Sequence, residues 1–140
     1  MAGSTVAVIG AGTTLAYESA PGTFTDLVNA VSVGSTGEKG EFVETTPINA
    51  TTKTFASGML TPPDKEITLN DVPGDADQED FLTKAKNRET VKMKVTFTNG
   101  RSGEFDLVLA GYVVNEPENG SAVTVTVTGK QSGETTWSVV

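Results

Sequence analysis

The chain has 140 residues, a mass of 14.5 kDa and a formal net charge of −8, and it contains neither cysteine nor histidine. This length accommodates one domain of ordinary size, and the acidic charge disfavours sequence-specific binding to DNA or RNA. The two missing residue types exclude disulfides, thiolate nucleophiles, imidazole bases and the usual zinc ligand sets.

The N-terminal third predicts a flexible arm followed by short strands. Residues 1–10 contain no Lys or Arg and no apolar run long enough for a signal-peptide core, so we expect a protein made in the cytoplasm. A membrane-spanning helix needs about 20 consecutive apolar residues, and because the sequence has no such run we expect no membrane insertion. Strands are predicted at Thr13–Glu18 and Ala30–Val33, with Pro21-Gly22 between them.

Residues 34–59 are the least regular part of the sequence. The stretch from Gly34 to Thr52 holds three glycines and several threonines, and only a short strand is indicated around Phe42-Val43. A loop of this length inside a compact domain is uncommon and is usually either functional or disordered. We therefore expect a long, exposed loop.

A strand and one helix follow the loop. Apolar and polar residues alternate in Lys65–Val72, which predicts a strand. A helix is predicted over about 75–87, because Asp75 can act as the N-cap and Gln78 stands in the capping-box position. Its apolar stripe consists of Phe81, Leu82 and Ala85.

The C-terminal half predicts an antiparallel meander. Strict alternation of apolar and polar residues appears in Val91–Phe97, Phe105–Leu109 and Val123–Val127. Beyond these strands, Gln131–Glu134 resembles a Gly/Ser turn, and we expect residues 131–140 to form a loose C-terminal segment.

The register of the first hairpin follows from its turn. A two-residue loop at Asn99-Gly100 would pair Val95 with Glu104 and place a core side chain beside a carboxylate. A three-residue loop, Thr98-Asn99-Gly100, removes this conflict. It places Met93 opposite Phe105, Val91 opposite Leu107, Lys94 opposite Glu104 and Lys92 opposite Asp106, with weak attraction within the two charged pairs.

The sequence contains no convincing motif for catalysis or metal binding. Val6–Gly12 looks like the start of a dinucleotide-binding fingerprint, but Leu15 occupies the position of the third glycine. Asp75–Asp80 resembles the start of a calcium loop without its glycine or its final glutamate. The predicted register places lysines opposite Glu104 and Asp106, which favours a solvated strand surface over a hydrolytic carboxylate pair. We therefore expect neither an enzyme nor a bound cofactor.

Several segments resemble, in the same order, the major tail tube proteins of long-tailed bacteriophages, particularly the lambda-like non-contractile group. Gly10-Ala-Gly-Thr-Thr-Leu-Ala-Tyr17 is similar to the family's opening. Val91-Lys-Met-Lys-Val-Thr-Phe-Thr-Asn-Gly100 is similar to its central hairpin, and Val123–Lys130 to its last strand.

This resemblance implies a mainly β fold, an antiparallel β-sandwich or barrel-like domain with one flanking helix. Six copies would form a ring, and stacked rings would make the hollow tube of the virion tail. The tube would enclose the tape-measure protein and conduct the genome into the host. The implied partners are further copies of the chain, the tape-measure protein, the tail terminator and the tail-tip proteins, while DNA passes through without specific binding.

The resemblance also suggests roles for particular residues. We expect Glu104 and Asp106 to line the lumen, where negative charge would repel DNA phosphates. The loop over residues 34–59 matches the family's loop between subunits and rings. The residues of this loop singled out for that role are Glu38, Lys39, Glu41, Phe42, Glu44, Asn49 and Lys53. The N-terminal arm and the C-terminal segment are expected to become ordered on stacking.

Two alternatives stay open from the sequence. The chain could be a tube subunit of a contractile injection machine, such as the type VI secretion system, which shares the ring plan. It could also be a virion decoration or binding module, which would form monomers or trimers in place of hexameric rings.

Overall fold

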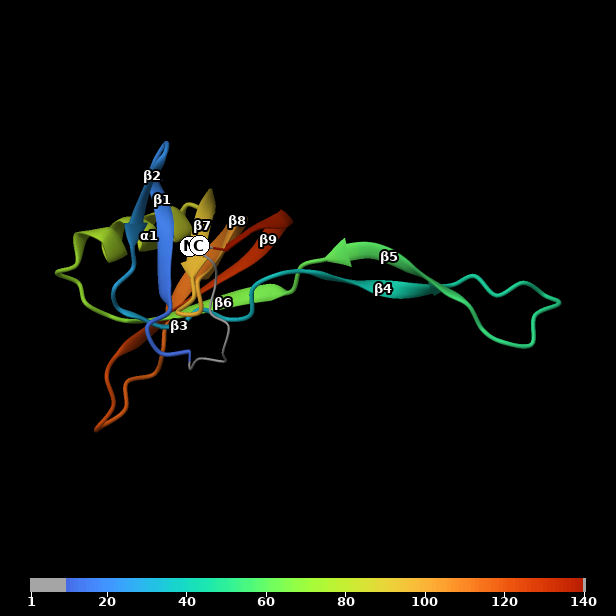
Figure 1. The fold of residues 1–140 in the computed structure, drawn as a ribbon. Coiled ribbons are helices and arrows are strands. Elements are labelled where there is room, and N and C mark those ends of the chain that lie inside the picture. Colours follow the sequence, from blue (N-terminus) through green and yellow to red (C-terminus); the bar gives the residue numbers. More distant parts are fainter. Residues whose placement is uncertain (1–9, 140) are drawn as a thin grey trace.

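A seven-stranded antiparallel sheet forms the body of the protein in the computed structural model, which describes residues 10–139 (Figure 1). The strand order is β2-β1-β7-β8-β9-β6-β3, so that β2 and β3 form the two edges. The sheet curves into a half-barrel with one helix against it, as the mainly β prediction with a flanking helix anticipated. The strands are β1 (Thr14–Ala20), β2 (Thr23–Asp26), β3 (Ala30–Ser32), β6 (Asp64–Asn70), β7 (Thr90–Thr96), β8 (Arg101–Val114) and β9 (Thr124–Val139).

The helix α1 (Ala76–Lys86) begins where the sequence predicts. The Asp75 carboxylate accepts hydrogen bonds from the backbone N–H groups of Asp77 and Gln78, at 3.2 and 3.4 Å. Gln78 does not complete the capping box, because the backbone N–H of Asp75 already donates to the carbonyl oxygen of Val72. The Gln78 side chain instead bonds the end of β6, accepting from Val72 N at 2.8 Å and donating to Asn70 O at 2.6 Å.

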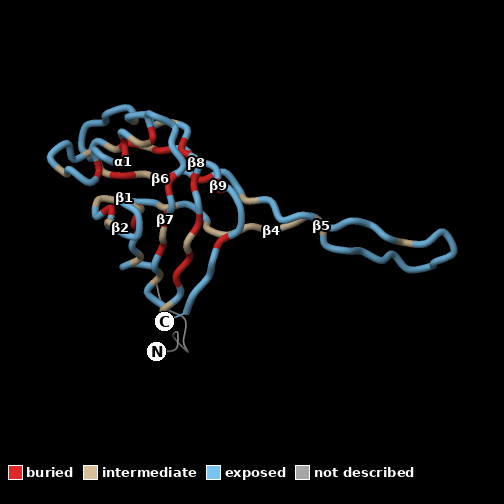
Figure 2. The backbone as a smooth tube through the Cα atoms, turned by 90° about the horizontal axis from the view of Figure 1, so that it is seen from above, coloured by how far each residue is buried: buried red, intermediate tan, exposed pale blue. Residues whose placement is uncertain are grey.

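One hydrophobic core lies between α1 and the sheet, and Figure 2 shows its buried positions in red. The predicted stripe on the helix faces this core. The largest side chains of the core are Tyr17, Phe81, Phe105, Leu15, Ile67, Leu69, Met93, Leu107 and Leu109.

The β7–β8 hairpin has the predicted register. Met93 lies opposite Phe105, and Val91 lies opposite Leu107. Phe97 N donates to Arg101 O at 2.8 Å, and Gly100 has a φ of 91°, which is the left-handed geometry expected of the last loop residue.

A lysine is buried on the core face of β6. Lys65 is 2% exposed, and its ammonium donates to Ser35 O at 2.9 Å and to Thr36 Oγ1 at 3.0 Å. The ammonium also lies 5.0 Å from the centroid of the Phe105 ring. Burial lowers the pKa of Lys65 to about 8, because the charged form loses its hydration.

The chain differs from the sequence-based expectation at its C-terminal end and in one short strand. Gln131–Glu134 is not a separate turn, since β9 continues through these residues and pairs with β8 as far as Val139. The strand β2, which follows the Pro21-Gly22 turn, was not predicted. The expected N-terminal arm, residues 1–10, lies outside the described residues apart from Gly10.

Candidate assembly surfaces

The expected long loop forms a two-stranded hairpin that extends away from the domain (Figures 1 and 2). Its strands are β4 (Lys39–Glu44) and β5 (Phe55–Thr61), and we call residues 39–61 the arm. The predicted short strand around Phe42-Val43 lies within β4. The partner strand β5 was not predicted.

The arm exposes large apolar side chains to solvent. Phe42 is 79% exposed, Met59 is 89% exposed, and Ile48 near the tip is fully exposed. Phe55, Leu60 and Val43 are also exposed. An isolated two-stranded hairpin is only marginally stable in water, and contiguous exposed apolar groups typically mark an interaction site. The arm therefore has the character of a surface that another molecule covers.

Three of these side chains share one face of the arm. Directly opposite residues of an antiparallel pair lie on the same face. The register pairs Phe42 with Ser57, Glu44 with Phe55 and Gly40 with Leu60. It follows that one face, here called the apolar face, carries Phe42, Phe55 and Leu60 together with Glu44 and Ser57, while the opposite face carries Lys39, Val43, Ala56 and Thr61.

Two glycines allow the strands of the arm to pass closely at an irregularity in their pairing. A Cβ on Gly40 would lie 2.8 Å from Met59 O, and a Cβ on Gly58 would lie 2.8 Å from Glu41 O. Backbone atoms cannot yield at such distances, so both positions require glycine. Glycine in residues 34–59 suggested an irregular loop, but at positions 40 and 58 it allows β4 and β5 to approach each other closely.

The structure distributes the predicted loop residues over three parts of the arm region. Glu38 lies half-buried in the segment that leads into β4, and Asn49 and Lys53 lie in the exposed connection between the strands. The remaining predicted residues are on β4, namely Lys39, Glu41, Phe42 and Glu44. Sequence reasoning missed Phe55, Met59 and Leu60, because β5 lacks the alternation of apolar and polar residues that indicates a half-buried strand.

Glu38 joins the arm to the last strand of the sheet. Its carboxylate accepts hydrogen bonds from Thr135 N at 3.1 Å, Thr135 Oγ1 at 2.9 Å and Gln131 Nε2 at 3.0 Å. Burial raises the pKa of the Glu38 carboxyl, but the hydrogen bonds from Thr135 and Gln131 outweigh burial and hold the pKa below its usual value.

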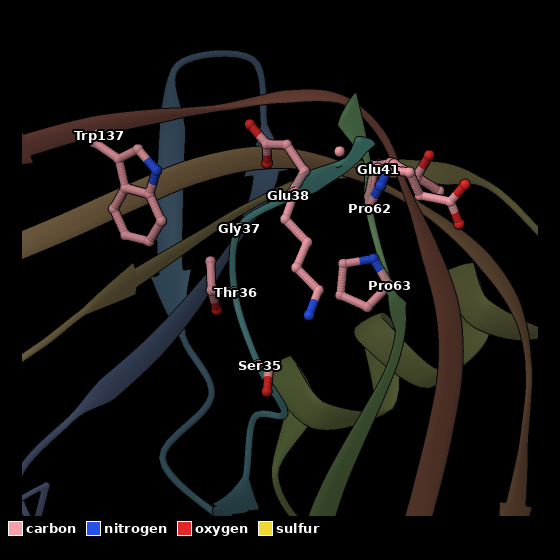
Figure 3. A pocket seen from close by; sticks show the side chains of 11 residues that line it. Ser35, Thr36, Gly37, Glu38, Glu41, Pro62, Pro63 and Trp137 are labelled. Carbon is pink, nitrogen blue, oxygen red and sulfur yellow. The ribbon is translucent and has the colours of Figure 1, made fainter. Parts of the chain in front are cut away.

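A hollow lies beside this junction (Figure 3). Its volume is about 710 Å³, with Trp137 on one side, Pro62 and Pro63 on the other, and residues 35–38 between them. Trp137 is 41% exposed. The base of the arm thus presents aromatic and proline surface to solvent.

The polar face of the sheet carries the two acids expected in the lumen. Glu104 is half-buried and Asp106 is exposed, and both lie on β8 on the side opposite the core. Lys94 and Lys92 lie opposite them in the predicted register, but neither pair forms a salt bridge in the described part of the chain. Lys94 extends instead toward the ring of Phe24, 5.9 Å from its centroid; an exposed ion pair would gain little free energy.

Residues 10–139 contain no cluster of acidic side chains that could hold a metal ion. Within the same residues, no helix is long and apolar enough to cross a membrane.

Comparison with known proteins identifies relatives of the whole chain. The sequence profile of the phage tail tube protein family matches residues 5–140. No curated protein sequence is significantly similar to the chain.

Solved structures of tube proteins share the fold. The tail of an empty GTA particle, refined with C6 symmetry, has a TM-score of 0.75 and 10% identity, covering 95% of this chain and 100% of that one. The SPP1 tail tube has a TM-score of 0.72 and 13% identity, with 96% and 81% covered. The sheath–tube complex of the extracellular contractile injection system PVC has a TM-score of 0.74 and 10% identity, with 97% and 94% covered.

Proposed function

This chain belongs to the phage tail tube protein family, and we propose that it polymerises as stacked hexameric rings into the hollow tail tube of a phage-like particle. The protein is a structural tube subunit and not an enzyme. The sixfold symmetry of the similar GTA tail supports the ring size.

The observation that carries the proposal is the arm with its exposed apolar face. A monomer leaves Phe42, Phe55 and Leu60 in water, and burying a large apolar side chain stabilises an interface by about 1.5–3 kcal/mol. We assign the arm, including Asn49 and Lys53 at its tip, to contacts with neighbouring subunits and rings. A second copy of the chain is the partner that is always present at high local concentration during assembly.

The two sheet edges offer a second contact. β2 and β3 end the sheet on opposite sides, and an unpaired strand edge can extend a sheet into the next molecule. Pairing of edges around a ring of six copies would join the sheets into one closed inner wall. The closed sheet would then have no unpaired strand edge.

We assign the polar face of the sheet to the lumen. Glu104 and Asp106 would there repel the phosphates of passing DNA, so that the genome slides without binding. Lys92 and Lys94 on the same face moderate the charge. The test is the double substitution Glu104→Lys plus Asp106→Lys. We expect tubes that assemble but deliver DNA poorly, and normal delivery would refute the lining role.

The lumen would hold the tape-measure protein during assembly and the genome during ejection. The tail terminator and the tail-tip proteins would contact the two ends of the tube. Capped tubes exist among the structural relatives, since a tube terminating cap of the anti-feeding prophage has a TM-score of 0.70 with this chain.

We favour the lambda-like, non-contractile tail on the sequence resemblance. The tube of a contractile injection system is the second candidate, because a sheath–tube complex matches the fold as well as phage and GTA tails do. Co-assembly with a sheath protein distinguishes the two candidates. A sheathed tube would establish the contractile system.

Negative-stain electron microscopy of the purified protein tests the proposed function. We expect hollow tubes of stacked rings at high protein concentration. Discrete trimers would overturn the proposal and favour a decoration module.

A variant with residues 41–58 replaced by a short Gly-Ser turn is expected to remain a folded monomer. Replacing residues 117–120 in the exposed β8–β9 loop is the control, and tubes from the arm-truncated variant would refute the role of the arm.

A further inference from the structure

The arm has no core of its own, so its direction depends on how its base is held. Residues 35–38, here called the root, lead from the sheet into β4. Pro62 and Pro63 connect β5 to β6 on the return path, and their rings restrict the backbone there. Any fixed orientation of the arm must come from contacts of these two segments.

Lys65 connects the root to β6, the strand that follows the arm in the chain. It is the second residue of β6, two positions after Pro63, and its ammonium donates to Ser35 O and Thr36 Oγ1 at 2.9 and 3.0 Å. These two bonds join the outgoing and the returning segments at one point. Placing an ammonium in a site that is 2% exposed is costly, and a core packing role alone would favour an apolar side chain.

Glu38 ties the other end of the root to β9. The pairing of β8 with β9 shifts between Glu104 and Asp106. At this irregularity the Thr135 N–H donates to the Glu38 carboxylate, at 3.1 Å to one oxygen and 3.3 Å to the other. The buried Gln131 side chain donates to the same carboxylate and to Thr135 Oγ1, at 3.0 and 2.8 Å. Hydrogen bonds to a charged group are stronger than those between neutral groups.

We propose that Glu38 and Lys65 are positioning residues that hold the arm in one direction before a second copy of the chain meets it. This inference rests on the proposed function, in which the arm contacts other subunits. An arm that is already oriented loses less conformational entropy on binding than one that swings freely. Without the contacts of either Glu38 or Lys65, the arm would keep its hairpin structure but would no longer be held in one orientation relative to the sheet.

The absence of cysteine from the chain allows a direct measurement of arm direction. Cysteines introduced as Asn49→Cys at the tip and Glu79→Cys on α1 would carry two spin labels, and double electron–electron resonance would give their distance distribution. We expect Glu38→Ala and Lys65→Met each to widen this distribution about twofold. Glu41→Ala, which removes an exposed carboxylate from the arm, is the matched control and is expected to leave the width unchanged.

Assembly of the unlabelled variants provides the second readout. Because the lost bonds involve charged groups, we expect Glu38→Ala to raise the protein concentration needed for tubes about tenfold. Glu38→Gln, which keeps one acceptor, should be affected less. Near-wild-type hydrogen exchange in β7 and β8 would show that the variants fold.

An unchanged distance distribution in Glu38→Ala and Lys65→Met overturns the inference, whether or not tubes form. This outcome is distinct from failure of the proposed function, which would appear as discrete trimers, and from failure of the role of the arm, which would appear as tubes of the arm-truncated variant. The spin-label measurement uses the monomer and does not depend on assembly.

Discussion

Tyr17 donates its hydroxyl hydrogen to the carboxylate of Asp80 over 2.8 Å, and this bond joins β1 to α1. The same hydroxyl lies 3.1 Å from the backbone oxygen of Asp77. The Tyr17 ring is fully buried and lies tilted against Phe81, with 5.3 Å between the ring centroids. Burial and the hydrogen bond to Asp80 raise the pKa of the phenol well above its usual value.

Breaking this contact should loosen the helix from the sheet. We expect Tyr17→Phe and Asp80→Asn each to lower the free energy of unfolding by about 1–2 kcal/mol, because each weakens a hydrogen bond that involves a charged group. Urea denaturation of both variants and of the double variant gives the coupling energy. A double variant whose loss equals the sum of the single losses would contradict a direct interaction.

The buried ammonium of Lys65 predicts a pH dependence of stability. Its pKa is about 8 in the folded protein, below the usual value of about 10.4 in an unfolded chain. Between these values the unfolded state binds more protons, so stability rises with pH, by at most about 1.4 kcal/mol per pH unit. Below about pH 8 the lysine is charged in both states and this gain is absent.

Comparison with Lys65→Met separates this effect from other titrations. The free energy of unfolding of the wild type, minus that of the variant, should increase from pH 7.5 to pH 9.5. Urea denaturation across this range measures the difference, and parallel pH profiles would contradict the prediction.

Gly129 on β9 provides space for a core leucine. A Cβ at this position would lie 2.8 Å from Leu107 Cγ. We therefore expect Gly129→Ala to lower the free energy of unfolding by about 1–3 kcal/mol through overpacking. Gly74→Ala is the control, since a Cβ there has no atom within 4 Å, and its effect should stay within about 0.5 kcal/mol. Equal effects of the two substitutions would disagree with this packing argument.

The two faces of the arm should differ in their importance for assembly. We expect Phe42→Ser to raise the concentration needed for tubes at least about tenfold, because a large apolar contact is lost. Val43→Ser on the opposite face is the matched control and should have a smaller effect. Sedimentation of tubes measures both. Thermal unfolding of the monomer should be unchanged, because neither side chain is buried there.

The body of the sheet was predictable because its signals are local. Alternation in Val91–Phe97 and a glycine suited to a left-handed turn at position 100 are enough to predict that Met93 lies opposite Phe105. The helix was predictable for the same reason, since Asp75 and the apolar stripe lie within about three turns of one another.

The arm and the C-terminal strand were not predictable in this way. β5 shows no alternation toward a core, because the domain provides no core for it. Gln131 and Thr135 are buried but polar, so the apolar pattern in the sequence stops at Val127. Their burial depends on Glu38, more than 90 residues away in the chain. Lys65 is likewise buried by a non-local partner, the root of the arm.

The arm projects from only one side of the subunit. A contact in which the arm of one copy binds the body of the next would therefore use different surfaces on the two copies. In the proposed tube, where stacked rings share one orientation, the apolar face of one copy would meet a different surface on the next copy, and the interface would not be self-complementary. A filament built through this arm therefore has two chemically distinct ends, one with free arms and one with free acceptor surfaces. Two chemically distinct ends would grow at different rates, and a protein that blocks one of them would leave elongation at the other possible.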